Sequence, residues 1–221
     1  MAFHLTIIEP DKPEYPSSLH DKNFLDLSAK IRAIGNPKIL DRPLVGLFCS
    51  VKCPGDLILR TYDLVRILRD VNVAVIGGFH SPIEKDCLDL LLRGTQPVVI
   101  CPARSVERMR IKKEHRQPLN EGRLLFLSPF NKSQRRPTVK TSHCRNLFVA
   151  ALSAVLFVAH AGPNSKTESI CREALSWKKP IYTFDSNYNE HLIQMGARAI
   201  TLDNVSDWAK FLTANPNQER L

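Results

Sequence analysis

Several features that would place this chain in a special class are scarce or missing. Its 221 residues include six cysteines that stand singly, without the second cysteine or histidine pair that a zinc site needs. The first ten residues contain no basic segment followed by an apolar stretch, so they predict no signal peptide. The longest apolar run, 147–161, is too short to span a bilayer and includes Ser153 and His160. We therefore expect a cytosolic protein without disulfides, a metal, a cofactor or a membrane span.

Acidic residues are scarce in one stretch of the chain. Between Arg104 and Arg145, twelve basic residues are opposed only by Glu107, Glu114 and Glu121, so the stretch has a net charge of +9, equal to that of the whole chain. A field of one sign concentrates polyanions. The charge therefore indicates nucleic acid or a nucleotide as partner, and a basic surface that only aids solubility is the alternative.

Short apolar runs alternate with amphipathic segments from Leu44 onward. This alternation predicts an α/β fold, an extended Rossmann-like parallel sheet with helices on both faces. The predicted strands are 44–49, 71–76, 97–101, 123–127, 154–159 and 180–184. The predicted helices are 56–68, 81–94, 144–152, 165–177, 190–195 and 207–212.

Two segments do not follow the alternation. The proline-rich residues 1–43 predict an N-terminal extension with one short helix at 25–33, and residues 44–221 then form the Rossmann-like domain. Residues 130–141 are basic and show no apolar periodicity, so they predict a loop.

Three of the predicted strand-to-helix turns, at 49–55, 77–81 and 161–167, consist of small or polar residues. In an open parallel sheet the ligand lies outside the carboxyl ends of the strands, at the point where neighbouring connections diverge. Backbone N–H groups at helix starts attract anions there. The turns therefore predict a phosphate-bearing ligand, although neither the Walker A spacing nor the dinucleotide-binding fingerprint is present.

The third turn is the most informative. Gly162 permits a close approach of the backbone, while Ser165, Lys166 and Thr167 supply hydroxyls and a positive charge at one helix start. The alternative is an ordinary capped helix, which Ser165 and Glu168 alone would explain.

Four other polar residues stand near the predicted ligand edge. Arg145, with Asn146 beside it, is expected near the start of a helix, where its guanidinium could bind phosphate or form a structural ion pair. His80 and His160 each end a predicted strand, and we assign neither a reaction because a single histidine is more often structural than catalytic.

Taken in order, these residues resemble the DprA/Smf family of DNA-processing proteins over most of the chain. Residues 15–19 are similar to the family's Tyr-Pro-x-x-Leu motif, residues 34–36 to the Gly-Asn before its first strand, and residues 192–197 to its closing Leu-Ile-x-x-Gly-Ala. Matches to its pocket motifs occur at Ser50 (Gly-Ser-Arg), Gly78 (Ser-Gly-x-Ala-x-Gly-Ile-Asp), Arg145 and Asn146 (Arg-Asn-Arg), and Ser165 and Thr167 (Ser-Gly-Ser).

The resemblance implies a homodimer without catalytic activity that binds single-stranded DNA in a basic pocket. It also implies a RecA-type recombinase as partner, in recombination or the uptake of DNA during natural transformation. The site expected from the turns and from the resemblance together comprises Ser50, Lys52, Gly77, Gly78, Arg145, Asn146, Gly162, Ser165, Lys166 and Thr167.

The departures from the family motifs keep two alternatives open. Val51, Leu147 and Lys166 stand where the motifs have two arginines and a glycine, although Lys52 and Lys166 could supply replacement contacts to phosphate. The first alternative is therefore a nucleotide-sensing domain of the same superfamily. The second is a nucleotide phosphoribohydrolase of the LOG type, in which Ile170 would stand in place of the glutamate that this chemistry uses.

Overall fold

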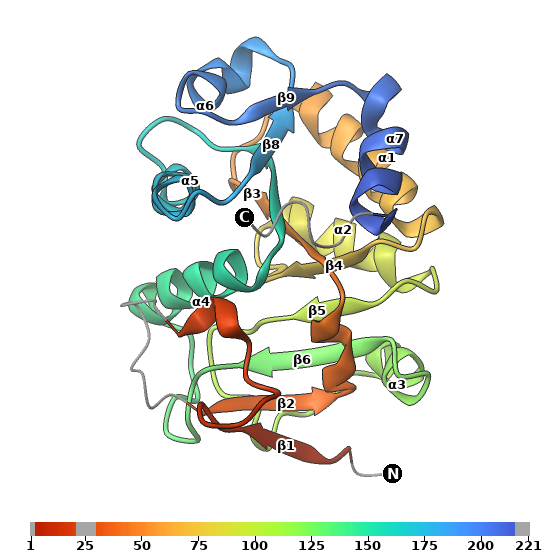
Figure 1. Ribbon diagram of the computed structural model, residues 1–221, viewed down its shortest axis with the longest axis vertical. Helices are drawn as coiled ribbons and strands as arrows, with labels where there is room; N and C mark the ends of the chain where they lie inside the picture. Colours follow the sequence, from red (N-terminus) through yellow and green to blue (C-terminus); the bar gives the residue numbers. More distant parts are fainter. Residues whose placement is uncertain (1–2, 21–29, 215–221) are drawn as a thin grey trace.

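A sheet of nine strands runs through the described part of the molecule (Figure 1). The structure, a computed structural model, describes residues 3–20 and 30–214, the side chains of residues 212–214 excepted. The strands are β1 (Leu5–Ile8), β2 (Ile31–Gly35), β3 (Leu44–Cys49), β4 (Ala74–Gly77), β5 (Val98–Ile100), β6 (Leu124–Ser128), β7 (Val155–His160), β8 (Ile181–Phe184) and β9 (Arg198–Ile200). Their order across the sheet is β1-β2-β6-β5-β4-β3-β7-β8-β9.

Helices cover both faces of this sheet. They are α1 (Gly55–Asp70), α2 (Pro82–Leu92), α3 (Lys113–Asn120), α4 (Val139–Leu152), α5 (Lys166–Ser176), α6 (Glu190–Gln194) and α7 (Leu202–Ala214), with short 3-10 turns at Ser17–Leu19, Pro37–Asp41 and Asn187–Asn189. Helices α1, α2, α3 and α7 pack on one face, and α4, α5 and α6 pack on the other (Figure 1).

The central strands are buried on both sides. In β3, Val45 and Leu47 belong to the core under α1, while Leu44 and Phe48 belong to the core under α4. All six residues of β3 and all six of β7 are buried. Burial on both faces explains why these strands are almost continuously apolar in the sequence.

The structure confirms the predicted α/β class, the six predicted strands and the six predicted helices, with shifted ends. One correction concerns strand direction: the seven strands from β6 to β9 in the sheet order are parallel, but β2 pairs antiparallel with both β6 and β1, so the sheet is mixed. The sequence interpretation missed β1, β2, β9 and α3, because each is short and β1 and β2 pair with partners distant in sequence.

Helix α4 begins five residues before the predicted start at Cys144. The hydroxyl of Thr138 accepts the N–H of Thr141, and the hydroxyl of Thr141 accepts the N–H of Thr138, so the two residues form a reciprocal cap. Arg145 and Asn146 therefore lie within α4 and not at its start. The predicted loop at 130–141 ends correspondingly earlier.

The N-terminal residues contribute strands to the same sheet. Strand β1 pairs with β2, and β2 pairs with β6, which belongs to the parallel part. Of the helix predicted at 25–33, residues 25–29 lie outside the described residues, and Ile31–Ala33 is β-strand. Whether residues 1–43 fold separately from residues 44–221 stays a prediction.

The contact between β7 and the C-terminal helix gives a test of the core. The ring of fully buried Phe157 meets the edge of Phe184 at 4.9 Å between centroids and lies 6.0 Å from Trp208 of α7. We expect Phe157→Ala to lower the free energy of unfolding by about 3–5 kcal/mol, because it opens a cavity between sheet and helix. Leu59→Ala, on the exposed face of α1 where Leu59 is 66% exposed, is the control and should cost less than about 0.5 kcal/mol. Urea unfolding followed by circular dichroism measures both, and equal losses would contradict this account.

Candidate phosphate-binding site

The sheet reverses its winding direction between β3 and β7. These two strands are neighbours and parallel, yet the chain continues from β3 to β4 on one side and from β7 to β8 on the other. The pairing shifts by one residue between Phe48 and Cys49, so that Cys49 lies opposite His160. Ser50 N–H then donates to the carbonyl of His160 at 2.9 Å. The loops that follow the two strands therefore start side by side at a topological switch point.

Ser50 connects these two loops through its hydroxyl. Gly162 N–H donates to Ser50 Oγ at 3.3 Å, and Ser50 Oγ donates to Ser165 Oγ at 3.5 Å. Lys52 and Lys166 are exposed, one on each loop. The structure thus brings together Ser50, Gly162 and Ser165, with Lys52, Lys166 and Thr167 beside them.

The third turn is a capped helix start that still leaves backbone donors open. Ser165 Oγ accepts the N–H of Glu168 at 3.1 Å, as predicted. The Glu168 carboxylate, however, accepts the N–H of Asn164 and not that of Ser165, so the reciprocal bond of a capping box is not formed. Its other oxygen pairs with Arg172 at 2.8 Å. The N–H groups of Lys166 and Thr167, in the first helical turn, have no carbonyl four residues earlier to bond. N–H groups at a helix start are able to bind an anion.

The second turn offers less to a ligand than predicted. The buried Glu84 carboxylate accepts the N–H of His80 at 2.8 Å and of Ser81 at 3.2 Å, so these donors at the start of α2 are already used. Its second oxygen accepts the N–H of Cys49 at 3.1 Å and so joins α2 to the end of β3. In the sequence, Glu84 is marked only by its capping-box spacing of three residues from Ser81.

Gly77, a predicted site residue, is buried beneath a ring. A Cβ on Gly77 would lie 3.0–3.2 Å from the ring of Phe79, which has a positive φ of 45° and folds back over the turn. Phe79 is 5% exposed, so it packs in the core and does not present its ring for base stacking.

Arg145 lies in the interior and not on the surface of the predicted ligand edge. It is 4% exposed; Nη1 donates to the carbonyl of Cys101 at 3.0 Å and Nε donates to Asn146 Oδ1 at 2.7 Å. Burial lowers the pKa of Arg145, while the nearby carboxylate of Glu84 acts in the opposite direction. Gly78 makes room for it, since a Cβ there would overlap the guanidinium. Gly78, Arg145 and Asn146 therefore form a structural group behind the loops.

His160 has a structural role, in line with the sequence interpretation. Its Nδ1 lies 2.9 Å from Oδ1 of the fully buried Asn189, and Asn189 Nδ2 donates to the carbonyl of Ala159 at 3.0 Å. These bonds fix the end of β7 to the turn after β8. His80 is exposed and lies at the start of α2.

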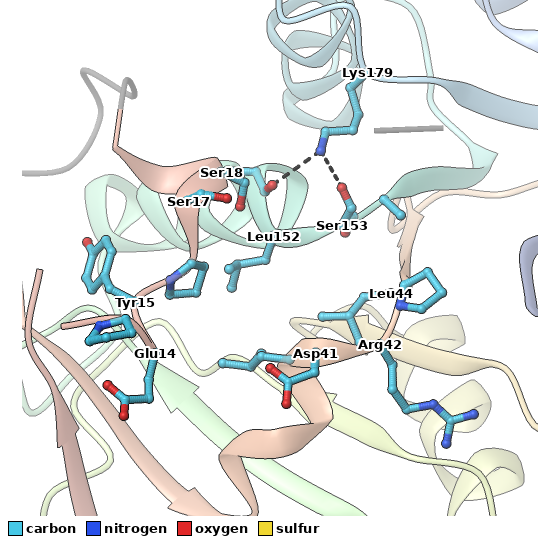
Figure 2. Close-up of a pocket in the computed structure, with 16 residues that line it drawn as sticks. Glu14, Tyr15, Ser17, Ser18, Asp41, Arg42, Leu44, Leu152, Ser153 and Lys179 are labelled. Carbon is cyan, nitrogen blue, oxygen red and sulfur yellow. Dashed lines mark hydrogen bonds between the residues drawn. The ribbon is translucent and has the colours of Figure 1, made fainter. Parts of the chain in front are cut away.

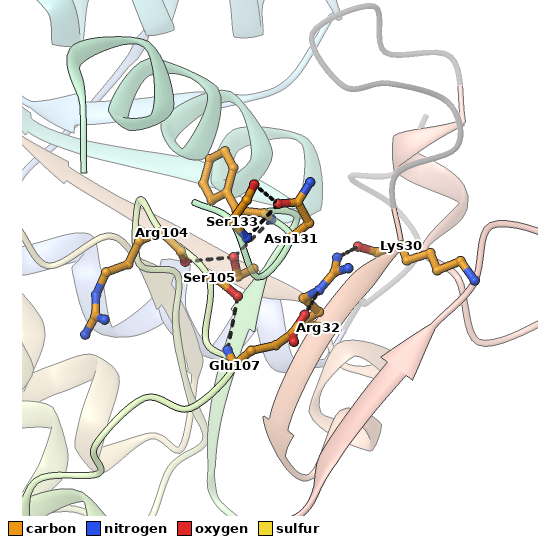
Figure 3. Close-up of polar contacts among 9 residues, drawn as sticks. Lys30, Arg32, Arg104, Ser105, Glu107, Asn131 and Ser133 are labelled. Carbon is orange, nitrogen blue, oxygen red and sulfur yellow. Dashed lines mark hydrogen bonds and ion pairs between the residues drawn. The ribbon is translucent and has the colours of Figure 1, made fainter. Parts of the chain in front are cut away.

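The basic stretch is divided between the two ends of the sheet. Beyond the carboxyl end of β6, Ser128 Oγ donates to the carbonyl of Arg104 at 2.9 Å, and Arg104 and Ser105 lie near Asn131 and Ser133 of the next loop (Figure 3). Ser105 N–H donates to the carbonyl of Gln134 at 2.8 Å, so the loops after β5 and β6 are joined. The exposed basic residues of the second loop and the start of α4 are Lys132, Arg135, Arg136 and Lys140. By contrast, Arg123 precedes β6 and pairs with Glu121 at 2.6 Å.

A cavity of about 580 Å³ lies at the opposite end of β3 and β7 (Figure 2). Residues of segments 13–18, 40–44 and 151–154 line it together with Lys179, whose Nζ donates to the carbonyls of Ala151 and Ser153. None of the ten predicted site residues lines this cavity. The Tyr-Pro-x-x-Leu motif therefore shapes the amino end of the sheet and not the predicted ligand edge.

The described residues contain no group of three or more histidine, cysteine or acidic side chains placed to hold a metal ion. All six cysteines are unpaired thiols. None of the described helices is both long enough and apolar enough to cross a membrane.

This sheet, with a switch point where two loops of small and polar residues meet, defines a Rossmann-like α/β protein. The family model for DNA recombination-mediator protein A matches residues 6–213. The chain belongs to this family, whose role is DNA processing and recombination, and the resemblance drawn from the sequence is confirmed. The comparison with curated protein sequences gives no match.

Solved structures show the same fold. DNA processing protein A of Helicobacter pylori, described as having a unique single-stranded DNA binding mode, matches with a TM-score of 0.75 at 21% identity, over 96% of this chain and 97% of that one. DNA processing protein A of Streptococcus pneumoniae matches with a TM-score of 0.72 at 18% identity, over 91% of this chain and 72% of that one. The molybdenum cofactor carrier protein of Chlamydomonas reinhardtii is more distant, with a TM-score of 0.51 at 13% identity, over 78% and 99%.

The packing of Arg145 on Gly78 can be tested by adding one methyl group. We expect Gly78→Ala to lower the free energy of unfolding by about 1–3 kcal/mol, because the new Cβ must displace the buried guanidinium. Gly55→Ala is the control, since a Cβ at the start of α1 meets no atom within 4 Å, and it should stay within about 0.5 kcal/mol of the parent. Chemical denaturation measures both; a Gly78→Ala protein as stable as Gly55→Ala would show that the guanidinium is free to move.

Proposed function

We propose that this protein binds single-stranded DNA along the carboxyl ends of its parallel strands. The observation that carries the proposal is the junction at Ser50, which holds the loops after β3 and β7 together and leaves Lys52 and Lys166 exposed on either side. The N–H groups at the start of α5 add anion-binding capacity at the same place. Membership of the family and the DNA binding of the Helicobacter pylori protein support this choice of ligand.

The extent of the basic surface favours a strand over a single nucleotide. Exposed basic residues follow β6 as well as β3 and β7, and β6 lies four positions from β7 in the sheet. At about 4.8 Å between neighbouring strands, these positions are roughly 19 Å apart. That span suits several successive phosphates, which Lys52 and Lys166 would contact at one end and Lys132, Arg135 and Arg136 at the other.

We further infer that the site binds without catalysing a reaction. Two acids beside the site, Glu84 and Glu168, are buried, and both oxygens of each already accept N–H groups. Neither is placed to act as a general acid or base in its present contacts. The phosphoribohydrolase alternative would need such an acid.

A small-nucleotide ligand is the second candidate, because Arg145 is withdrawn into the interior and cannot contribute a phosphate contact from its present position. In this case a nucleotide would bind only at the loops after β3 and β7, which Ser50 joins. Saturable thermal stabilisation by a nucleoside monophosphate, without stabilisation by oligothymidine, would favour it.

The remaining partners follow from family likeness. We propose a second copy of this chain and a RecA-type recombinase as partners, in the cytosol, during recombination or natural transformation. Loading of a recombinase filament on DNA in the presence of the protein would test the second of these.

The DNA proposal predicts a salt-dependent interaction through the two lysines. Labelled oligothymidine should bind, with duplex DNA as the control ligand, and the logarithm of the affinity should fall linearly with the logarithm of salt concentration. Replacing Lys52 and Lys166 together by alanine should weaken binding about tenfold or more and reduce the slope by roughly 1.4, because each phosphate contact on a single strand contributes about 0.7.

Lys178→Ala is the matched control, since Lys178 is exposed at the far end of α5. Fluorescence anisotropy at several salt concentrations measures affinity and slope together. An unchanged affinity and slope in the double variant would remove the site from the loops after β3 and β7.

A further inference from the structure

A second basic surface lies away from the DNA-binding edge proposed above. A groove of about 560 Å³ lies beside β1 and β2, next to α3. Leu5 pairs with Ile34, and Ile34 pairs with Phe126 in the middle of β6, so the groove lies on the face of the sheet that α3 covers and not beyond the carboxyl ends of the strands. None of the ten predicted site residues lines it.

The floor of the groove is apolar and mostly aliphatic. Leu5 and Ile34 come from the sheet and Met109 and Ile111 from the segment after β5, with Phe3 at one end. All except Ile34 are only partly buried, and they pack against the core under α1. Because side chains alternate along a strand, Ile7 lies on the same face as Leu5, and it is 49% exposed. The apolar surface therefore extends along β1.

An ion pair fixes the wall of this groove. Arg32 of β2 donates through Nε to Glu107 and through Nη1 to the carbonyl of Lys30 (Figure 3). The pair is mostly buried, with side-chain exposures of 14% and 21%. It anchors the segment that continues into Arg108 and Met109, so the wall is positioned before any partner arrives.

Three arginines on the rim of this groove have no acidic partner within the described residues. Arg108, Arg110 and Arg116 are exposed, and no ion pair or hydrogen bond engages their side chains in that part of the chain. The nearest acids in sequence are engaged elsewhere: Glu107 by Arg32, and Glu114 by Lys112 at 3.4 Å. The rim thus carries unbalanced positive charge over an apolar floor.

We propose that this groove docks an extended acidic segment with apolar side chains, contributed by a partner protein. The arginines would pair with its carboxylates and the aliphatic floor would cover its apolar side chains. Among the described residues no strand pairs with the outer edge of β1, where an extended segment could add by backbone pairing. Nucleic acid fits less well, because bases stack on aromatic rings and the lining contains only Phe3.

A direct test uses a short fluorescein-labelled peptide in which aspartate alternates with isoleucine, titrated with the whole protein by anisotropy. We expect saturable binding that Arg110→Glu/Arg116→Glu weakens about tenfold or more. Both side chains are exposed, so the variant should fold. Lys178→Glu, on the other face of the sheet, is the control and should change peptide affinity little. A peptide with serine in place of isoleucine should bind about tenfold more weakly or worse.

Parallel titration with oligothymidine separates this proposal from the proposed DNA site. We expect Arg110→Glu/Arg116→Glu to lower the affinity for oligothymidine by no more than twice the effect that the single charge reversal Lys178→Glu has. The proposal is overturned if the parent protein does not bind the peptide, if the double variant binds it as well as the parent, or if the serine peptide binds equally. A loss of oligothymidine affinity as large as the loss of peptide affinity would assign the groove to the DNA path instead.

Discussion

Two buried charges, Glu84 and Arg145, hold together the ends of three neighbouring strands. Glu84 accepts backbone N–H groups from Cys49 at the end of β3 and from His80 and Ser81 after β4. Arg145 reaches from α4 across Gly78 to the carbonyl of Cys101 after β5. The two charges attract each other through the low-dielectric interior. Removing either would leave the other without compensation, which is costly in a buried position.

This buried pair divides the ligand edge into a fixed part and an exposed part. In the second turn, the backbone N–H groups of His80 and Ser81 bind Glu84, and the glycines pack against Phe79 and Arg145. This turn is therefore the fixed part. Glu84 fixes the end of β3 from below, and the loops after β3 and β7 keep Lys52 and Lys166 exposed. A rigid base with charged loops above it suits a polyanion whose backbone is held without reading each base.

How far the sequence predicts this structure depends on the range of each interaction. Central strands such as β3 and β7 are predictable because burial on both faces makes them apolar throughout. The direction of β2 is not, because its partner β6 lies about ninety residues away and nothing local specifies the pairing. The position of Ser50, Ser165 and Lys166 in the loops after β3 and β7 was predictable from their turns, and their contact with a ligand stays a prediction. The burial of Arg145 was not, since an arginine is normally exposed and its place depends on the missing side chain of Gly78.

The division of the basic stretch into two surfaces also depends on the path of the chain through the sheet. In the sequence, Arg104 to Arg145 is one positive run, but β6 passes through the middle of it and carries the chain from one end of the sheet to the other. Five residues of strand span roughly 16 Å, longer than the screening distance of about 8 Å at physiological salt. Arg123, which precedes β6 directly, and the basic residues after β6 therefore act as separate surfaces, while Arg104 lies with the residues after β6. After β6 they lie among polar loops, which suits phosphates; before it, Arg110 and Arg116 border an aliphatic floor, which favours carboxylates on a chain that also carries apolar side chains.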